Sequence, residues 1–224
     1  MKKVLLAILV VSAPTMAADQ RKTTLQPDAS YVLVEIGKLE GAMVKGFDNP
    51  GSLTIAPYDS TTHDIVAAQR IVLFNKPVAK SKLSRQYVVK VQPATWVIEG
   101  ASGTAFSLGS KTFVVHPGEI VDLGVMKPEI DWLDGEGPKS MAGSMLSTAF
   151  FGSMKPKQVR PVRIKWTRRQ PTSLPLPASI GERAVTPVTL IDGATFDNNL
   201  GGLINRFAGR SSRPSDDPAN PPSS

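Results

Sequence analysis

Short apolar runs alternate with turn residues from Pro27 to about Leu133, and this pattern predicts β-strands. The runs are rich in β-branched and aromatic side chains, whereas the separators contain Gly, Pro, Asn and Asp. A spacing of about ten residues between runs favours antiparallel hairpins that pack as a β-sandwich. The predicted strands cover residues 31–36, 53–56, 70–74, 86–91, 95–99, 111–115 and 119–125.

The sequence His116-Pro117-Gly118 predicts a tight turn between the last two of these strands. Proline presets φ at one turn position, and glycine tolerates a positive φ at the next. We therefore expect residues 113–115 to fold back onto residues 120–123 as a hairpin.

Strand character returns at residues 159–166, where apolar side chains alternate with Arg163 and Lys165. A period of two turns the apolar set inward and the basic set outward. Residues 184–191 predict a further strand, which Pro187 confines to an edge or a bulge. The segment between these strands contains three closely spaced prolines and is interpreted as an extended linker.

The end of the chain predicts a short amphipathic helix over residues 195–209. Thr195 can cap it, large apolar residues follow at helical spacing, and Gly209 can end it. Such a helix could dock on its own domain or bind a partner. Residues 210–224 lack any large apolar side chain and are predicted to be disordered.

A segment of small residues and methionines, 136–155, interrupts the strand pattern. On a helix, Met141 and Met145 would share a face, and flexible methionine side chains are common at adaptable binding surfaces. The alternative is a loop or short helix that covers one end of the sandwich.

These patterns together predict a mostly β fold. It is an antiparallel β-sandwich with one or two short peripheral helices and a disordered C-terminal tail. The predicted parts are a core over residues 18–135, the Met-rich connector 136–155, additional strands with a Pro-rich linker over 156–194, the helix 195–209 and the tail 210–224.

Residues 1–17 have the organisation of a signal peptide. Lys2 and Lys3 precede an apolar run over residues 4–11, which is far shorter than the roughly 20 residues that span a bilayer. Small residues at the end of the segment favour cleavage between Ala17 and Ala18. We therefore expect a periplasmic or secreted protein.

Composition limits the possible partners. The chain has 224 residues, of which 41% are hydrophobic, a proportion that suits a globular protein and excludes a collagen. It contains no cysteine, and therefore neither a disulfide nor a thiolate nucleophile. The full chain has a net charge of +7, and cleavage after Ala17 would remove Lys2 and Lys3 and leave 24 basic and 19 acidic residues, a net charge of +5. On an exported protein this charge points to an anionic envelope polymer, a membrane surface or an envelope protein as partner, and not to nucleic acid. The oligomeric state is left open.

One part of the chain resembles a known family. An extended run at residues 86–91, a strand ending at Gly100, and a final segment from Pro117 to Gly124 follow one another in that order. Over residues 28–126 the chain resembles small exported bacterial β-sandwich domains of unknown function. The resemblance implies a fold and a compartment, and it implies no catalytic residues.

The main candidate site is a basic stripe within a stretch, residues 137–181, that contains no Asp or Glu. Lysine and especially arginine bind phosphate and carboxylate groups well. Alternatively, the stripe is a solvated strand face whose cations protect a sheet edge, or the preceding cluster Glu129, Asp131, Asp134 and Glu136 neutralises it. The predicted anion-binding residues are Lys155, Lys157, Arg160, Arg163, Lys165, Arg168 and Arg169.

Catalytic and metal signatures are weak. The acidic cluster does not have the spacing of an EF-hand loop. Ser102 lacks the glycine two places later that a nucleophile elbow requires, and His63 and His116 lie in predicted turns. We therefore predict no catalytic residues, no metal site and no cofactor.

The predicted function is that of a non-enzymatic, exported cell-envelope binding or structural protein with a basic strand face. One alternative is a protein-interaction subunit that assembles through the Met-rich segment or the C-terminal helix. The other is an envelope hydrolase, which requires Ser102, His116 or the acidic cluster to converge in one pocket.

Overall fold

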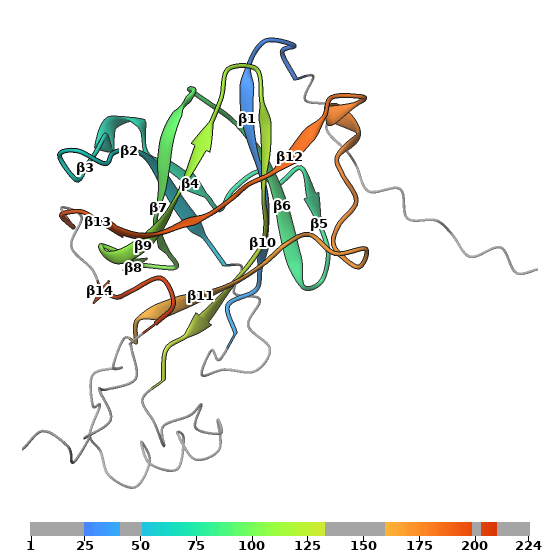
Figure 1. The fold of residues 1–224 in the computed structure, drawn as a ribbon. Helices are drawn as coiled ribbons and strands as arrows, with labels where there is room; N and C mark the ends of the chain where they lie inside the picture. The colour runs from blue at the N-terminus through green and yellow to red at the C-terminus, as the bar shows by residue number, and fades with distance from the viewer. Residues whose placement is uncertain (1–24, 41–50, 133–159, 199–202, 210–224) are drawn as a thin grey trace, which may run out of the picture.

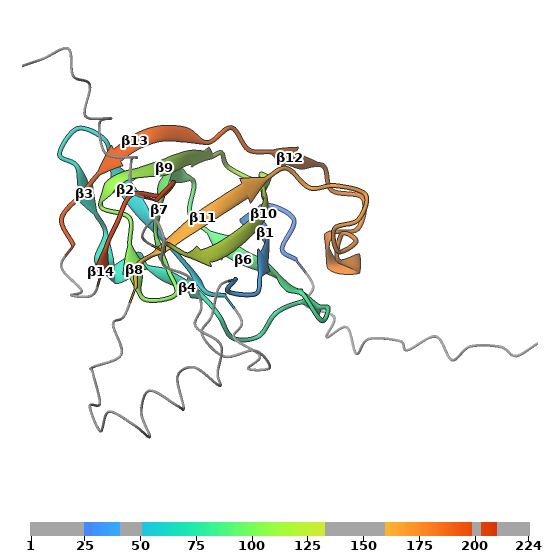
Figure 2. The same ribbon diagram turned by 90° about the horizontal axis from the view of Figure 1, so that it is seen from below.

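Two β-sheets packed together make a sandwich-like fold (Figures 1 and 2). The structure, a computed structural model, describes residues 25–40, 51–132, 160–198 and 203–209. The predicted signal peptide, the predicted Met-rich connector and the predicted C-terminal tail all lie outside the described residues. The described residues contain no α-helix, and their helical content is two 3₁₀ turns, Ala67–Gln69 and Ala178–Ile180. The predicted mostly β fold class is therefore confirmed.

The first sheet has the strand order β11-β10-β1-β6-β5, and β12 also pairs with β10. Its strands are β1 (Ser30–Gly37), β5 (Ala79–Lys80), β6 (Ser84–Val91), β10 (Ile120–Ile130), β11 (Val162–Thr167) and β12 (Val185–Pro187). β1 is antiparallel to β6 but parallel to β10, and β12 is also parallel to β10. The sheet is therefore mixed, whereas the sequence pattern predicted a mostly antiparallel sandwich and did not foresee these parallel pairs.

The second sheet has the strand order β13-β9-β7-β2-β3. These strands are β2 (Leu53–Asp59), β3 (Asp64–Ile65), β7 (Ala94–Ala101), β9 (Leu108–Val115) and β13 (Ile191–Thr195). Three short strands complete it: β4 (Ile71–Leu73) pairs with β2, while β8 (Thr104–Ala105) pairs with both β7 and β14 (Leu203–Ile204).

The main core lies between the sheets because alternate side chains of each strand turn inward. On β1, Val32, Val34 and Ile36 join the main cluster, and Trp96 and Phe113 enter it from the second sheet. All five are at most 2% exposed. Burying an aliphatic or aromatic side chain of this kind stabilises a fold by roughly 1.5–3 kcal/mol. The predicted strands therefore form because their apolar residues fill one shared interior.

A second apolar cluster lies on the outer face of the first sheet. Tyr31 and Leu33 of β1 pack there with Leu25, Ile120 and Ile180. Ile180 belongs to the segment between β11 and β12. We expected this segment to be an extended linker. This segment also covers sheet surface, and it forms one boundary of the candidate site.

All the predicted strands are present. The seven runs before residue 126 correspond to β1, β2, β4, β6, β7, β9 and β10, and the alternating run at 159–166 corresponds to β11. The run at 184–191 contributes to two strands, β12 and β13, which belong to different sheets.

The predicted hairpin at His116-Pro117-Gly118 is wrong. β9 pairs with β7 and β13, whereas β10 pairs with strands of the other sheet, so this turn crosses between the sheets. The Ser30 hydroxyl holds the crossing in place, since it donates to the His116 carbonyl (2.9 Å) and accepts from the Gly118 N–H (3.0 Å). Gly118 adopts the positive φ that the turn prediction requires. However, hydrogen bonds from Ser30 of β1, which is distant in sequence, direct the chain after the turn into the other sheet.

The predicted helix over residues 195–209 is also wrong. Thr195 ends β13, and β14 lies within the same range. Phe196 packs in a separate cluster with Ala194. Phe207 enters the main core, where its ring packs edge to face against Phe106 with 5.5 Å between the ring centroids. The apolar residues that suggested one helical face therefore serve two separate clusters.

A bulge in β10 decides which of its side chains face outward. Leu33 of β1 pairs with Asp122, but Glu35 pairs with Val125, so β10 contains one extra residue. Gly124 adopts φ +76°, and a Cβ at this position would lie 2.4 Å from the Thr167 carbonyl oxygen. The bulge therefore requires glycine both for its φ and for the close approach of β11.

We predict that Gly124→Ala destabilises the fold by about 3 kcal/mol or more, because it adds a backbone clash to the strain of positive φ. Gly118→Ala is the matched control, since Gly118 has φ +71° and open space around it. Its cost should be limited to about 1–2 kcal/mol. Urea unfolding of both variants measures the difference, and equal destabilisation would contradict the close-approach argument.

Candidate functional site: a cation face and an adjoining pocket

The outer faces of β10 and β11 carry two of the predicted anion-binding residues. Arg163 lies directly opposite Glu129 in the strand pairing, and Lys165 lies directly opposite Lys127. The side chains of Arg163 and Lys165 are 39% and 57% exposed. Their inward-facing neighbours, Val162 and Ile164, are buried in the main core. The predicted alternation of β11 is therefore confirmed.

Glu129 neutralises part of this surface. Its Oε2 accepts hydrogen bonds from Arg163 (Nη2 at 3.0 Å) and from Lys165 (Nζ at 2.9 Å). Burial raises the pKa of Glu129, but the hydrogen bonds and charges of these two cations outweigh burial and hold the pKa below its ordinary value. One member of the acidic cluster therefore balances the stripe within the molecule, as the second alternative foresaw.

Arg169 turns away from solvent and contacts two carboxylates. Its Nε and Nη2 donate to the two oxygens of Asp122 at 2.8 and 3.1 Å. Its Nη1 donates to Glu35 at 3.2 Å and to the Leu174 carbonyl at 3.1 Å. Arg169 therefore anchors the segment that follows β11, and its guanidinium is occupied.

The structure describes two of the four remaining predicted cations, Arg160 and Arg168. Lys155 and Lys157 lie outside the described residues. Arg160 is the first residue of a described range, and it has an interaction partner of its own. Arg168 directly follows β11 and is exposed, with no side-chain partner among the described residues.

Lys127 is the cation that the sequence pattern missed. It is exposed, and its side chain has no hydrogen-bond or ion-pair partner within the described ranges. The bulge at Gly124 shifts the alternation of β10, so the face on which Lys127 lies does not follow from a simple period of two. Its position opposite Lys165 depends on the pairing of β10 with β11, which the sequence alone does not reveal.

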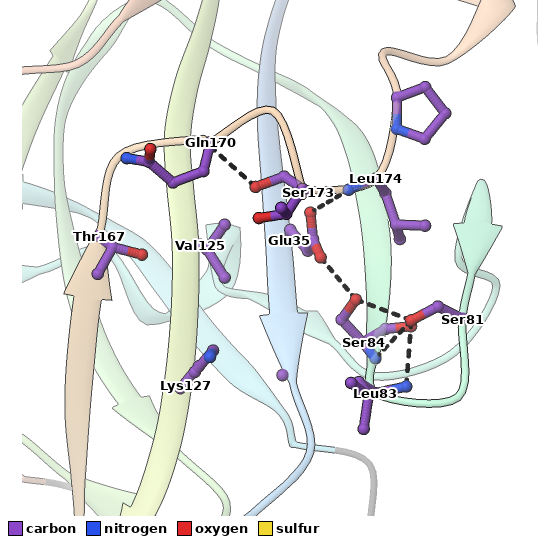
Figure 3. A pocket seen from close by; sticks show the side chains of 13 residues that line it. Glu35, Ser81, Leu83, Ser84, Val125, Lys127, Thr167, Gln170, Ser173 and Leu174 are labelled. Atoms are coloured by element: carbon purple, nitrogen blue, oxygen red, sulfur yellow. Dashed lines mark hydrogen bonds between the residues drawn. The ribbon is translucent and has the colours of Figure 1, made fainter.

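A pocket of about 400 Å³ adjoins these cations on the outer face of the first sheet (Figure 3). Residues of β1 and β10 lie on one side of it, and the turn between β5 and β6 lies on another. The segment over residues 170–175 completes the lining. Lys127 lines this pocket, so the pocket and the cation-bearing strands form one continuous candidate site.

Glu35 holds the pocket walls together. This carboxylate is only 5% exposed. Its Oε1 accepts from the Ser84 hydroxyl at 2.6 Å, and its Oε2 accepts from the Leu174 N–H at 2.9 Å (Figure 3). Arg169 also donates to this Oε2. A buried charge is tolerated when it is paired and hydrogen-bonded in this way. Glu35 therefore ties the β5–β6 turn and the 170–175 segment to β1.

Gly37 leaves room for Lys127. A Cβ at position 37 would lie 3.0 Å from Cγ of Lys127, so the lysine stem crosses the strand at a place where β1 has no side chain. Both residues line the pocket. Thr167 and Thr172 also line it, and neither hydroxyl has a partner among the described residues. The pocket therefore offers an ammonium and several free hydroxyl groups to a ligand.

The candidate catalytic residues do not converge. Ala94, at the start of β7, pairs with Val115 beside His116, whereas Ser102 follows the other end of β7. A strand of this length separates Ser102 from His116 by roughly 23 Å at about 3.3 Å per residue. Asp131 is buried and accepts from Asn205 Nδ2 at 2.9 Å, while Asp134 and Glu136 lie outside the described residues.

The part of the chain that the structure describes shows neither a metal-binding cluster nor a membrane-spanning helix. In the described part of the chain, no group of three or more His, Asp or Glu side chains is placed to hold a metal ion. None of the helical segments described there has the length and apolarity needed to cross a membrane. No protein-family model, curated protein or solved structure matches this chain. The resemblance to exported β-sandwich domains thus stays a prediction.

We predict that Arg169→Met destabilises the fold by about 3–5 kcal/mol, because two carboxylates would lose their shared cation in a mostly buried place. Arg168→Met is the matched control on the neighbouring, exposed residue, and its effect should stay within about 0.5 kcal/mol. Chemical denaturation measures both. Similar, small effects from the two substitutions would show that Arg169 is not an anchor.

We also predict that Glu129 stabilises the fold above the ordinary glutamate pKa of 4.5, because its pKa is lowered in the folded state. This stabilisation should disappear as the pH falls through the lowered folded value. The stability difference between the wild type and Glu129→Gln should therefore shrink on acidification from neutral pH. Denaturation curves across this range provide the measurement, and a difference that grows on acidification would contradict the pairing.

Proposed function

We propose that this protein is a non-enzymatic, exported binding protein that contacts an anionic polymer of the cell envelope. The contact surface is the cation face, which we define as Lys127, Arg163, Lys165 and Arg168. One observation carries the proposal: Lys127 and Lys165 lie directly opposite each other on neighbouring strands. Like charges in this arrangement repel each other, and a bound anion would relieve the repulsion.

The charge balance of the cation face supports this proposal. Glu129 pairs with Arg163 and Lys165, so one carboxylate serves two cations. Lys127 and Arg168 have no ion-pair partner among the described residues. The face therefore keeps a positive surplus despite the internal neutralisation, and lysine and arginine suit carboxylate and phosphate ligands.

A polymer fits this surface better than a lipid bilayer. Peripheral membrane proteins usually add large apolar side chains to their cations, so that binding combines charge with insertion. The large exposed apolar residues come from other elements, and none belongs to β10 or β11. A strand face without large exposed apolar side chains favours contact with a hydrated polyanion.

The alternatives receive less support. The interaction-subunit alternative invoked a C-terminal helix, but Phe207 is buried in the main core, β13 ends at Thr195, and β14 lies within that range. Its other surface, the Met-rich segment, lies outside the described residues. The hydrolase alternative required Ser102 and His116 to share a pocket, and β7 separates them. Export continues to depend on the signal-peptide pattern of residues 1–17.

We predict that the double variant Lys165→Gln, Arg168→Gln binds polygalacturonate more weakly than the wild type, with a weaker salt dependence. The slope of log affinity against log salt should fall by up to about one for each cation removed, because fewer counterions are displaced. Retention on immobilised polygalacturonate over a salt series gives this slope for each protein.

The control is the double variant Lys76→Gln, Lys90→Gln, which loses the same charge outside the cation face. It should behave almost as the wild type does, because screening limits the reach of exposed charges to roughly 10 Å at 0.1 M salt. Equal losses in the two double variants would show that net charge alone governs binding and would contradict a defined contact face.

A further inference from the structure

We infer that the pocket beside the cation face binds one acidic sugar unit, with Lys127 contacting its carboxylate and the surrounding hydroxyl groups contacting its hydroxyls. This inference rests on the proposed function, because Lys127 of β10 belongs to the cation face and also lines the pocket. It adds a ligand class: a uronic acid, as a terminal unit or a free sugar.

Charge places the ligand's anion at Lys127. Of the described residues that line the pocket, Lys127 is the one cation, and it has no partner among them. Glu35 also lines the pocket, but Arg169 contacts its Oε2 at 3.2 Å, so its negative charge is partly balanced. Three donors already reach the two oxygens of Glu35, which leaves room for about one more hydrogen bond, such as one from a sugar hydroxyl.

The remaining lining suits a hydroxylated ring. Thr167 and Thr172 offer hydroxyl groups that no described residue uses. The Ser173 hydroxyl accepts from the Gln170 N–H at 3.0 Å and keeps its own proton for a ligand. Leu83 and Val125 supply aliphatic surface for the C–H side of the ring. The volume of about 400 Å³ lies in the lower part of the range for small-molecule sites, which suits one sugar.

The walls of the pocket are organised in advance of binding. Ser84 and Leu174 both hydrogen-bond Glu35, which fixes two walls to β1. The Ser81 hydroxyl accepts from the N–H groups of Leu83 and Ser84 at 3.1 and 3.0 Å, which shapes the β5–β6 turn. A site fixed in this way loses little conformational entropy when a ligand binds.

A carboxylate fits better than a phosphate. Phosphate sites usually combine arginine forks, several cations or a nest of backbone N–H groups. Here the described lining offers a single lysine, and the nearby arginine, Arg169, is occupied by carboxylates. One ammonium amid hydroxyl groups matches a ligand with one negative charge and several hydroxyls.

The experiment titrates the full chain with galacturonate, with galactose and with inorganic phosphate, followed by protein NMR. Galacturonate should bind at least about tenfold more tightly than galactose, because its carboxylate makes a charge-assisted hydrogen bond. Lys127→Gln should reduce galacturonate affinity by a similar factor. Lys90→Gln is the control: it removes a cation that belongs neither to the cation face nor to the pocket lining, and should change the affinity less than about twofold.

A second variant tests the hydroxyl contacts without changing charge. Thr172→Val removes one hydroxyl at an exposed position, where it should leave the fold intact, and should weaken galacturonate binding several-fold. Equal affinities for galacturonate and galactose would overturn the inference. So would tighter binding of phosphate, or an equal loss in Lys127→Gln and Lys90→Gln.

The outcomes separate this inference from the proposed function. If galacturonate does not bind but polygalacturonate retention still depends on Lys165 and Arg168, the pocket inference fails and the cation face stands. If galacturonate binds through Lys127 while polymer retention ignores Lys165 and Arg168, the proposed polymer contact fails and the pocket stands as a sugar-acid site.

Discussion

The contact between Arg169 and the carboxylates of Glu35 and Asp122 is the interaction on which the rest of the site depends. Glu35 lies on β1 and Asp122 on β10, so one guanidinium joins the two parallel strands at the centre of the first sheet. Removing one partner would leave a buried charge without compensation, which costs far more than an exposed ion pair contributes. The segment that follows β11 is therefore held against the sheet, and the pocket lies beneath it.

The strands were predictable because their signal is local. Alternation of apolar and polar residues marks each strand, and in β11 it also assigned the outward direction of Arg163 and Lys165. Sheet membership was not predictable, because it depends on contacts between distant segments. Ser30 directs the turn after β9 into the other sheet through hydrogen bonds to His116 and Gly118, which lie 86 and 88 positions later in the chain. The composition of the turn and the spacing of the strands do not show which sheet the chain enters after β9.

The site was partly predictable for the same reason. A stretch without acidic residues pointed to the basic strand, but it could not show that Glu129 pairs with two of its cations or that Arg169 turns inward. Lys127 was missed because the bulge at Gly124 resets the alternation of β10. The pocket brings together residues from Glu35 to Pro175, and only the folded sheet places them side by side.

The central claim is that anions contact the outer face of β10 and β11. The most direct measurement is the mapping of backbone amide shifts in the ¹⁵N-labelled protein on addition of a short oligogalacturonate. The account predicts shifts that concentrate at residues 125–129, 163–168 and 170–174. Shifts that concentrate on β9 and β13 of the opposite sheet, with those segments unchanged, would contradict it.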